Sequence, residues 1–290
     1  MVTSQKSKIF DIFLVVMMIL LVLICLMPIL HLASVSLSAN NAILTRSVGI
    51  WPNGFNLSSY TAVTGDPTMI RSLGFTIVLT LGYATISMLM TILTAYPLSK
   101  KKLKGRNIFL VIIVLTMYFS GGMIPDYLLV KNLGMLNQVS ALILPGLVSA
   151  YNMIILKTFF TNLPESLEES ATIDGASHLT ILFKIVLPLS TPVLATLTLF
   201  YAVSRWNGFQ DALIYITKPQ LYPLQLKLYQ IVYNNMALDI SQIEGSMGPT
   251  LLPESLKAAS VMFATIPILL VYPWLQRYFI SGIMIGAIKG

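Results

Sequence analysis

The chain has little charge for a protein of its size. Lysine, arginine, aspartate and glutamate together make up 10% of its 290 residues, whereas hydrophobic residues make up 56%. A soluble domain carries roughly 25% charged residues, so this chain has too few polar side chains to cover a surface that faces water. Its mean hydropathy is +0.81. This composition excludes a soluble enzyme, a disordered protein and a secreted disulfide scaffold, and it predicts a polytopic membrane protein.

Cysteine and histidine are also nearly absent. The single cysteine, Cys25, lies inside an apolar run, which excludes a disulfide within the chain and a cysteine-based metal site. We interpret His31 and His178, which are far apart in the sequence, as structural histidines held by hydrogen bonds. No G-x-x-x-x-G-K-[ST], H-E-x-x-H or G-x-S-x-G motif occurs. The sequence therefore predicts no catalytic residues, no metal site and no cofactor, and it does not predict an enzyme.

Long apolar runs dominate what is present. A membrane-spanning helix needs about 20 apolar residues, and a backbone exposed to lipid must satisfy its own hydrogen bonds, so each run is predicted to be a helix. Five prolines within or near the ends of the runs are expected to cause kinks: Pro28, Pro97, Pro125, Pro145 and Pro267. The six predicted spans cover about 9–37, 72–98, 107–130, 141–160, 192–216 and 258–275.

The basic residues predict the orientation of these spans. With the N-terminus inside, inner segments hold eleven lysines and arginines and outer segments hold six, and the short run KKKLKGR at 100–106 is the largest cluster. Because loops rich in Lys and Arg stay in the cytoplasm, both termini are expected to be cytoplasmic. The chain is then one transmembrane domain, 1–290, with external loops at about 39–71 and 217–257 and an internal loop at about 161–190. The net charge of +7 comes from lysines and arginines in the loops next to the spans, and it does not indicate a nucleic-acid partner.

The internal loop has an unusual pattern for a connection between spans. Pro164 and three glutamates begin a predicted amphipathic helix, because acidic residues favour the positive end of a helix dipole. Asp174-Gly175 is expected to bend the chain sharply. A second, apolar helix is predicted from Ser177 to Leu187, with Pro188 stopping it. The predicted result is an exposed elbow tied to two spans, suited to contact with a cytoplasmic partner.

The elbow resembles the E-A-A-x-x-x-G-x9-I-x-L-P signature of bacterial ABC importer permeases. Glu169-Ser170-Ala171, Gly175, Ile185 and Leu187-Pro188 match its spacing, with Ser170 in place of the first alanine. The string EESATIDGA at 168–176 is similar to the version found in carbohydrate importers. The resemblance implies coupling to an ATPase through Glu168, Glu169, Ser170, Ala171, Asp174, Gly175, Ala176, Ser177 and Pro188.

Two further resemblances narrow the family. The C-terminal segment QRYFISGIMIGAIKG is similar to the tail of the smaller permease of maltose-type importers, which implies ATPase contacts at Gly286, Ala287, Lys289 and Gly290. The segments 120–137 and 200–216 look like the subset that imports complex oligosaccharides and pectin- or alginate-type fragments. Asp126 departs from that subset, in which a small uncharged polar residue is expected.

The family resemblance implies a six-span type I ABC importer permease in the bacterial cytoplasmic (inner) membrane, surrounded by lipid. Such a permease pairs with a second, homologous permease. Two cytoplasmic ATPase subunits bind and hydrolyse ATP, and an extracellular or periplasmic binding protein delivers a sugar or oligosaccharide. The chain would then form half of the translocation path.

The fifth predicted span contains a cluster of polar residues. Asn207, Gln210 and Asp211 stand at i, i+3 and i+4, which would place them on one face of a helix. With Trp206, they have the amide, carboxylate and aromatic groups that bind sugars. One interpretation is that these four residues line the translocation path. The alternative is that Arg205 pairs with Asp211, or that the cluster holds two permeases together. Asp126 either lines the path or caps a helix break at Gly121-Gly122.

Three other functions remain alternatives. An amino-acid or peptide ABC permease shares the Glu169–Pro188 signature, although the C-terminal tail argues against it. An ion-coupled secondary transporter usually has more spans or a visible repeat. An intramembrane enzyme would need a nucleophile–base pair or a metal cluster, and the sequence shows neither pattern.

Overall fold

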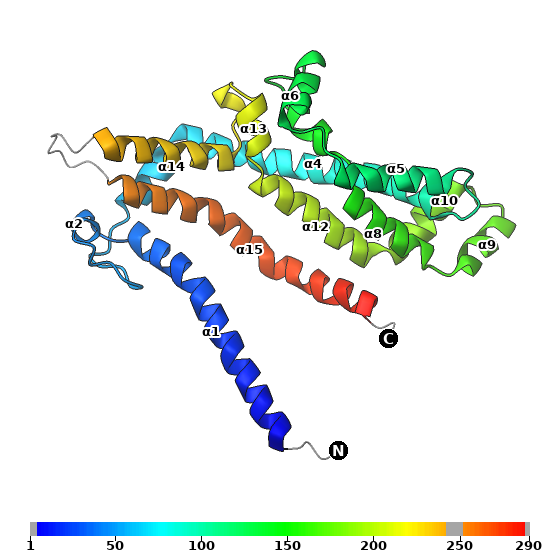
Figure 1. The fold of residues 1–290 in the computed structure, drawn as a ribbon, viewed down its shortest axis with the longest axis horizontal. Coiled ribbons are helices and arrows are strands. Elements are labelled where there is room, and N and C mark those ends of the chain that lie inside the picture. The colour runs from blue at the N-terminus through cyan, green and yellow to red at the C-terminus, as the bar shows by residue number, and fades with distance from the viewer. Residues whose placement is uncertain (1–4, 242–251, 288–290) are drawn as a thin grey trace. The chain divides into compact units, whose positions relative to one another are not determined.

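The computed structural model describes residues 5–241 and 252–287, and within these ranges every regular element is a helix (Figure 1). The chain divides into two compact units. One comprises Met1–Ile70 and Lys227–Ile268, and the other comprises Arg71–Leu226 and Leu269–Gly290. The polar cluster and the elbow both belong to the segment Arg71–Leu226 of the second unit.

Three helices are long and apolar enough to cross a membrane. They are α1 (Gln5–Ser36), α4 (Pro67–Ser99) and α15 (Pro253–Ala287), with candidate spans at Phe10–Ser36, Pro67–Ser99 and Pro253–Val271. These helices agree with the first, second and sixth predicted spans. Each contains a proline at which a kink was predicted, and each helix continues through it.

The third and fourth predicted spans are not single helices. The third is broken into α5 (Arg106–Tyr118) and α6 (Met123–Asn132), whose axes differ by 115°. The break lies at the two glycines, where Gly122 has φ +90°, a conformation that favours glycine over residues with a side chain. The fourth consists of α7 (Ser140–Ile143), the 3-10 turn η1 (Leu144–Gly146) and α8 (Ala150–Thr161), with a bend of 51°.

The fifth predicted span is also broken, and here the sequence-based prediction of one continuous helix was wrong. Helix α12 (Thr191–Asn207) ends before Gly208, and α13 (Gln210–Tyr215) begins after Phe209. The predicted i, i+3, i+4 helix face of Asn207, Gln210 and Asp211 therefore does not exist, because Asn207 stands on one helix and the other two stand on the next.

The elbow folds largely as expected. Helix α9 (Glu165–Ile173) is followed by α10 (His178–Ile181), the π-helical turn η2 (Leu182–Val186) and α11 (Leu187–Leu189). The helix does not stop before Pro188. A proline cannot donate to the carbonyl four residues earlier and clashes with it, and the wider π turn directly before Pro188 relieves that constraint. The chain then bends by 84° into α12.

The remaining helices lie in the segments expected as external loops. The first of these segments carries α2 (Asn40–Leu44) and α3 (Ser58–Gly65), and the second carries the 3-10 turn η3 (Pro219–Leu221) and α14 (Leu224–Ser241). His31 makes the structural hydrogen bond that the sequence suggested, from its Nδ1 to the carbonyl oxygen of Gly49 at 2.9 Å.

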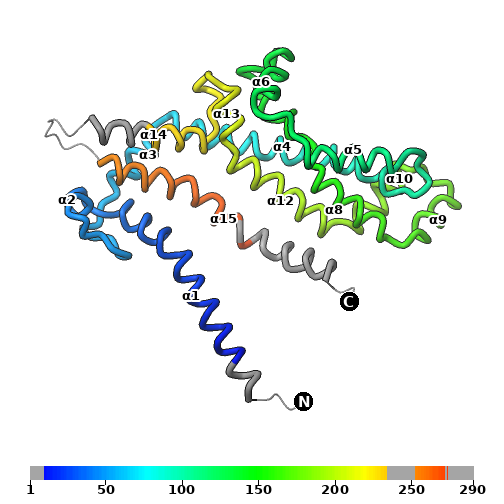
Figure 2. The backbone as a smooth tube through the Cα atoms, viewed as in Figure 1, coloured from blue at the N-terminus to red at the C-terminus, as the bar shows by residue number. Residues whose placement is uncertain are grey.

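The core of the second unit is formed by α4, α8, α12 and the helices of the elbow (Figure 2). Helix α8 contacts both α5 and α12, and its Met153 and Leu156 are fully buried. A smaller apolar cluster joins α7 and α13 through Leu142 and Ala212. The bent helices are therefore packed against one another at the break between α12 and α13, where the polar cluster lies.

Candidate functional site

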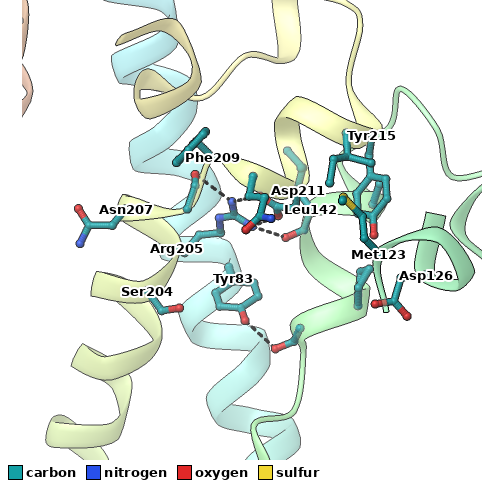
Figure 3. Close-up of a pocket in the computed structure, with 16 residues that line it drawn as sticks. Tyr83, Met123, Asp126, Leu142, Ser204, Arg205, Asn207, Phe209, Asp211 and Tyr215 are labelled. Carbon is teal, nitrogen blue, oxygen red and sulfur yellow. Dashed lines mark hydrogen bonds and ion pairs between the residues drawn. The ribbon is translucent and has the colours of Figure 1, made fainter. Parts of the chain in front are cut away.

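A pocket of about 620 Å³ opens at the break between α12 and α13. Its volume lies in the range of roughly 300–1,000 Å³ that is usual for small-molecule sites. Figure 3 shows its lining side chains, which come from α4, α6, α7, η1, α12 and α13. Four of the five residues predicted from the sequence to line a path do line this pocket: Asp126, Asn207, Gln210 and Asp211.

Arg205 and Asp211 form an ion pair in the wall of this pocket. The Nη2 of Arg205 donates to Oδ1 of Asp211 at 2.9 Å, and Nη1 donates to Oδ2 at 2.5 Å. The Arg205 side chain is 6% exposed and that of Asp211 is 30% exposed. The sequence left open whether Asp211 lines a path or pairs with Arg205. In the structure Asp211 does both, because it pairs with Arg205 and also lines the pocket.

The guanidinium of Arg205 also holds the broken helix ends in place. Its Nη1 donates to the carbonyl of Leu142 at 2.9 Å, and its Nη2 donates to the carbonyl of Gly208 at 3.2 Å (Figure 3). One side chain therefore satisfies carbonyls on α7 and in the α12–α13 connection while pairing with α13. Charge-assisted bonds of this kind are stronger than neutral ones, which explains how the break is maintained inside an apolar unit.

Two glycines allow the close contacts around the pocket. A Cβ atom at Gly208 would lie 2.7 Å from Nη2 of Arg205, and one at Gly146 would lie 2.9 Å from the Tyr83 hydroxyl. That hydroxyl donates to the carbonyl of Gly146 at 2.6 Å. Sequence reasoning missed Tyr83, Gly146 and Gly208. The glycine directly after Asn207 was the one available signal, since a glycine near the end of a helical pattern often ends the helix.

Trp206 and Asn207, which are adjacent in the sequence, have different places in the structure. Trp206 is 9% exposed and is absent from the residues that line the pocket. The structure therefore does not bring Trp206 to the pocket surface, and its place on the translocation path stays a prediction. Asn207 lines the pocket but points away from the ion pair (Figure 3), and its amide donates to the carbonyl of Val203 at 3.0 Å.

Asp126 lies on the opposite wall of the pocket, near Met123 and Tyr215 (Figure 3). It is exposed and stands in the first turn of α6, where a negative charge is favourable. The side-chain cap that one interpretation proposed is absent, since the capping residue is Gly122. Within the described part of the chain, the structure shows no hydrogen bond or ion pair to the Asp126 carboxylate.

The elbow is tied to the basic run 100–106. The Nζ of Lys100 pairs with both carboxylate oxygens of Glu168, and it also lies 4.3 Å from the centre of the Tyr96 ring. Lys101 makes a longer, exposed pair with Glu165 at 3.5 Å. Two features that the sequence identified separately, the basic run and the acidic helix, therefore stand side by side.

The bend of the elbow has the backbone geometry that its sequence suggested. Gly175 has φ +81°, and a Cβ atom there would have nothing within 4 Å. The hydroxyl of Ser177 caps α10 by accepting from the amide of Thr180 at 3.3 Å. Ala171 is buried in the apolar core, which agrees with the need for a small residue in this part of the signature.

The outer face of the elbow is exposed. Glu169, Ser170, Asp174 and Gly175 are all exposed, whereas Glu168 and Ala176 are half-buried. Large apolar side chains are exposed beside them, and Ile173 at the end of α9 is 86% exposed. Pro188 and Ser177 are exposed as well. The elbow thus presents both carboxylate and apolar groups on an accessible surface.

The C-terminal residues are described only in part. Gly286 and Ala287 form the end of α15, without a described side-chain environment. Lys289 and Gly290 lie outside the described residues. Among the residues searched, no group of three or more histidine, cysteine, aspartate or glutamate side chains is placed to hold a metal ion.

Comparison with known proteins identifies the family. Residues 105–285 match the family model described as the binding-protein-dependent transport system inner membrane component. The chain belongs to this family. The chain is therefore a permease component of a transport system in the inner membrane, and the resemblance seen in the elbow signature is confirmed.

Similar proteins cover almost the whole chain. Protein LplC of Bacillus subtilis (strain 168) is 40% identical over 289 residues, which is 99% of this chain and 97% of that protein. The polygalacturonan/rhamnogalacturonan transport system permease protein YtcP of the same strain is 40% identical over 288 residues, 99% of this chain and 100% of that protein.

The fold also matches a solved transporter. A crystal structure of a bacterial ABC transporter involved in the import of the acidic polysaccharide alginate contains a chain that is 32% identical. The TM-score is 0.86, and the match covers 96% of this chain and 99% of that chain. The fold is therefore that of an ABC transporter permease.

Proposed function

We propose that the chain is one of two homologous permease subunits of an ATP-driven importer for a sugar or oligosaccharide, and that it acts as a single transmembrane domain over 1–290. An external binding protein delivers the sugar. Two cytoplasmic ATPases bind and hydrolyse the ATP, and this chain needs no cofactor. The polar pocket at the α12–α13 break carries the proposal, because it places amide, carboxylate and hydroxyl groups beside aromatic rings in a family of transport permeases.

The pocket is proposed to lie on the translocation path. Gln210 is exposed, lines the pocket and makes no hydrogen bond that the structure shows within the described residues, so its amide is free to bind a sugar hydroxyl. Reconstituted into lipid vesicles with its partners, the wild-type complex should take up oligosaccharide with ATP. Gln210→Ala should reduce uptake severalfold without reducing the yield of complex. Normal uptake by this variant would remove Gln210 from the path.

The topology is proposed to have six spans with both termini in the cytoplasm. Three long helices and three bent pairs amount to six if each pair forms one span, and the basic run 100–106 favours the cytoplasmic side. A single cysteine introduced at position 102 in a Cys25→Ser background tests this. An impermeant thiol reagent should label it in inside-out vesicles and leave it unlabelled in intact cells, and the reverse pattern would contradict the topology.

The elbow is proposed to bind the ATPase. It presents the exposed residues Glu169 and Gly175 together with the apolar side chain of Ile173. Gly175→Val should abolish transport and weaken co-purification of the ATPase, because valine is strained at positive φ and adds bulk to the docking surface. Glu169→Ala should have a milder effect of the same kind.

Gly175→Asn is the matched control for this variant, since asparagine tolerates the left-handed region. It should insert as well as wild-type and keep more of the bound ATPase than Gly175→Val. Wild-type recovery of the ATPase with Gly175→Val, alongside normal uptake, would contradict the docking role. The tail residues Gly286, Ala287, Lys289 and Gly290 are proposed to add to the same contact.

A further inference from the structure

The charge of the pocket bears on whether it accepts acidic sugars, such as uronates, or uncharged ones. Its lining contains three charged side chains, namely Asp126, Arg205 and Asp211. Two carboxylates and one guanidinium give the lining a formal charge of minus one. YtcP and the structurally matched importer carry the names of acidic polymers, whose uronate units each bear a carboxylate. The pocket of this chain would repel such a group rather than bind it.

The single cation of this pocket lining is not available to a ligand. Arg205 is 6% exposed and donates to both oxygens of Asp211 and to two backbone carbonyls. Its partner Asp211 is the more exposed member of the pair, at 30%. The pair therefore presents its carboxylate to the pocket and keeps its guanidinium in the protein. The Nη atoms of Arg205 already donate to Asp211 and to the two carbonyls, and its Nε, which has no partner among the described residues, is buried, so a sugar carboxylate finds no accessible cation there.

Asp126 adds a second carboxylate on the facing wall. No hydrogen bond or ion pair to it occurs within the described part of the chain, and it is exposed to the pocket. Two carboxylates that converge on one pocket can accept hydrogen bonds from neutral hydroxyls, but they disfavour a third negative charge. Gln210 and Ser204 in the same lining are uncharged hydrogen-bonding groups and suit a neutral sugar equally well.

From these contacts we infer that the pocket of this chain selects uncharged sugar units and rejects uronates, and that Asp126 is the residue that sets this selectivity. This inference rests on the proposed function, because it concerns the sugar that passes this pocket. Asp211 contributes to the same field but cannot be changed alone without leaving Arg205 buried and unpaired. Asp126 is therefore the residue that can be altered without disturbing the ion pair.

The test compares each acidic oligosaccharide with its own methyl ester, in which the carboxylate is masked and the sugar backbone is unchanged. Trigalacturonate and its trimethyl ester form one such pair, and glucuronic-acid-containing xylotriose and its ester form another. Uptake is measured with the full complex, including the binding protein, in lipid vesicles. The acid-to-ester uptake ratio of each variant is divided by that of the wild type, which cancels the preference of the binding protein.

Asp126→Asn removes one negative charge and should raise the acid-to-ester ratio by about 3- to 10-fold, as expected for one charge at close range in a partly solvated site. Asp126→Lys should raise it further. Glu254→Gln is the matched control, because Glu254 is an exposed carboxylate at the start of α15 and does not line the pocket, and its ratio should stay at the wild-type value.

The outcomes separate this inference from the proposed function. If esters and acids are both taken up and the ratio for Asp126→Asn and Asp126→Lys stays within twofold of wild type, the charge assignment is overturned and sugar import stands. If no member of either pair, and no neutral trisaccharide such as maltotriose or arabinotriose, is taken up or stimulates ATP hydrolysis, the proposed function itself fails.

Discussion

The pocket and the elbow belong to the same segment, Arg71–Leu226. The contacts that stabilise each of them differ in how far apart the contacting residues stand in the sequence. At the pocket, Arg205 binds the carbonyl of Leu142 and Tyr83 binds that of Gly146, so each bond joins residues that are 63 positions apart. At the elbow, the cap and the bend are made by residues within a few positions of one another. Damage to the long-range bonds of the pocket should therefore unfold the unit as a whole, whereas loss of the cap or the bend of the elbow should stay local.

The largest effect is expected for Arg205→Met. This change leaves the Asp211 carboxylate without its partner and frees two backbone carbonyls, and breaking a buried pair in this way costs about 3–5 kcal/mol. Thermal unfolding of the purified protein in lipid nanodiscs should show a large drop in the midpoint. The double variant Arg205→Met/Asp211→Leu should recover much of the loss, because it removes both charges. A loss no larger than that of Lys101→Ala, which breaks an exposed pair, would contradict this account.

Gly208→Ala should come next in size. The added Cβ would lie 2.7 Å from Nη2 of Arg205 and 3.3 Å from the carbonyl oxygen of Ser204, and such overpacking costs about 1–3 kcal/mol. The same thermal measurement applies. Gly82→Ala is the matched control, since a Cβ at Gly82, inside α4, meets nothing within 4 Å and alanine is the better helix former. Equal midpoints for the two variants would show that Gly208 is not required for the break.

At the elbow, Ser177→Ala should have a smaller and local effect. The change removes the cap of α10, which is worth about 1 kcal/mol. Hydrogen exchange followed by mass spectrometry should show faster exchange of the amides that begin α10, while the peptides of α4 and α12 stay as in the wild type. Faster exchange throughout the unit would mean that the elbow is as strongly coupled to the core as the pocket is.

The smallest effect is expected for the long-range contact of the elbow with the basic run. Lys100 and Glu168 are 31% and 23% exposed, whereas Lys101 and Glu165 are 68% and 73% exposed. After allowance for screening by solvent, a double-mutant cycle with alanine should give a coupling of about 0.5–1 kcal/mol for the first pair and near zero for the second. A coupling of several kcal/mol would place Lys100–Glu168 in the same class as Arg205–Asp211.

Local sequence rules predicted the elbow well because its shape depends on neighbouring residues. A proline before the acidic turn, a glycine at the bend and a serine before the apolar helix each act over a few residues, and each stands where the sequence placed it. The exception is Pro188, where the π turn before the proline allows the helix to continue. A π turn of this kind depends on how the surrounding residues pack, and no local sequence pattern predicts it.

The amino-acid sequence by itself determined that the chain is a helical membrane protein, that it belongs to a family of transport permeases, and that polar residues gather near 205–211. Only the tertiary structure decided how those residues meet. The break after Asn207 removes the helix face that spacing predicted. Trp206 is buried, and Asp126 on α6 stands on the wall of the pocket facing Asp211. Periodicity assumes a continuous helix, whereas the bonds of Arg205 to Leu142 and Gly208 stabilise a broken one, and such bonds form only when distant segments have packed together.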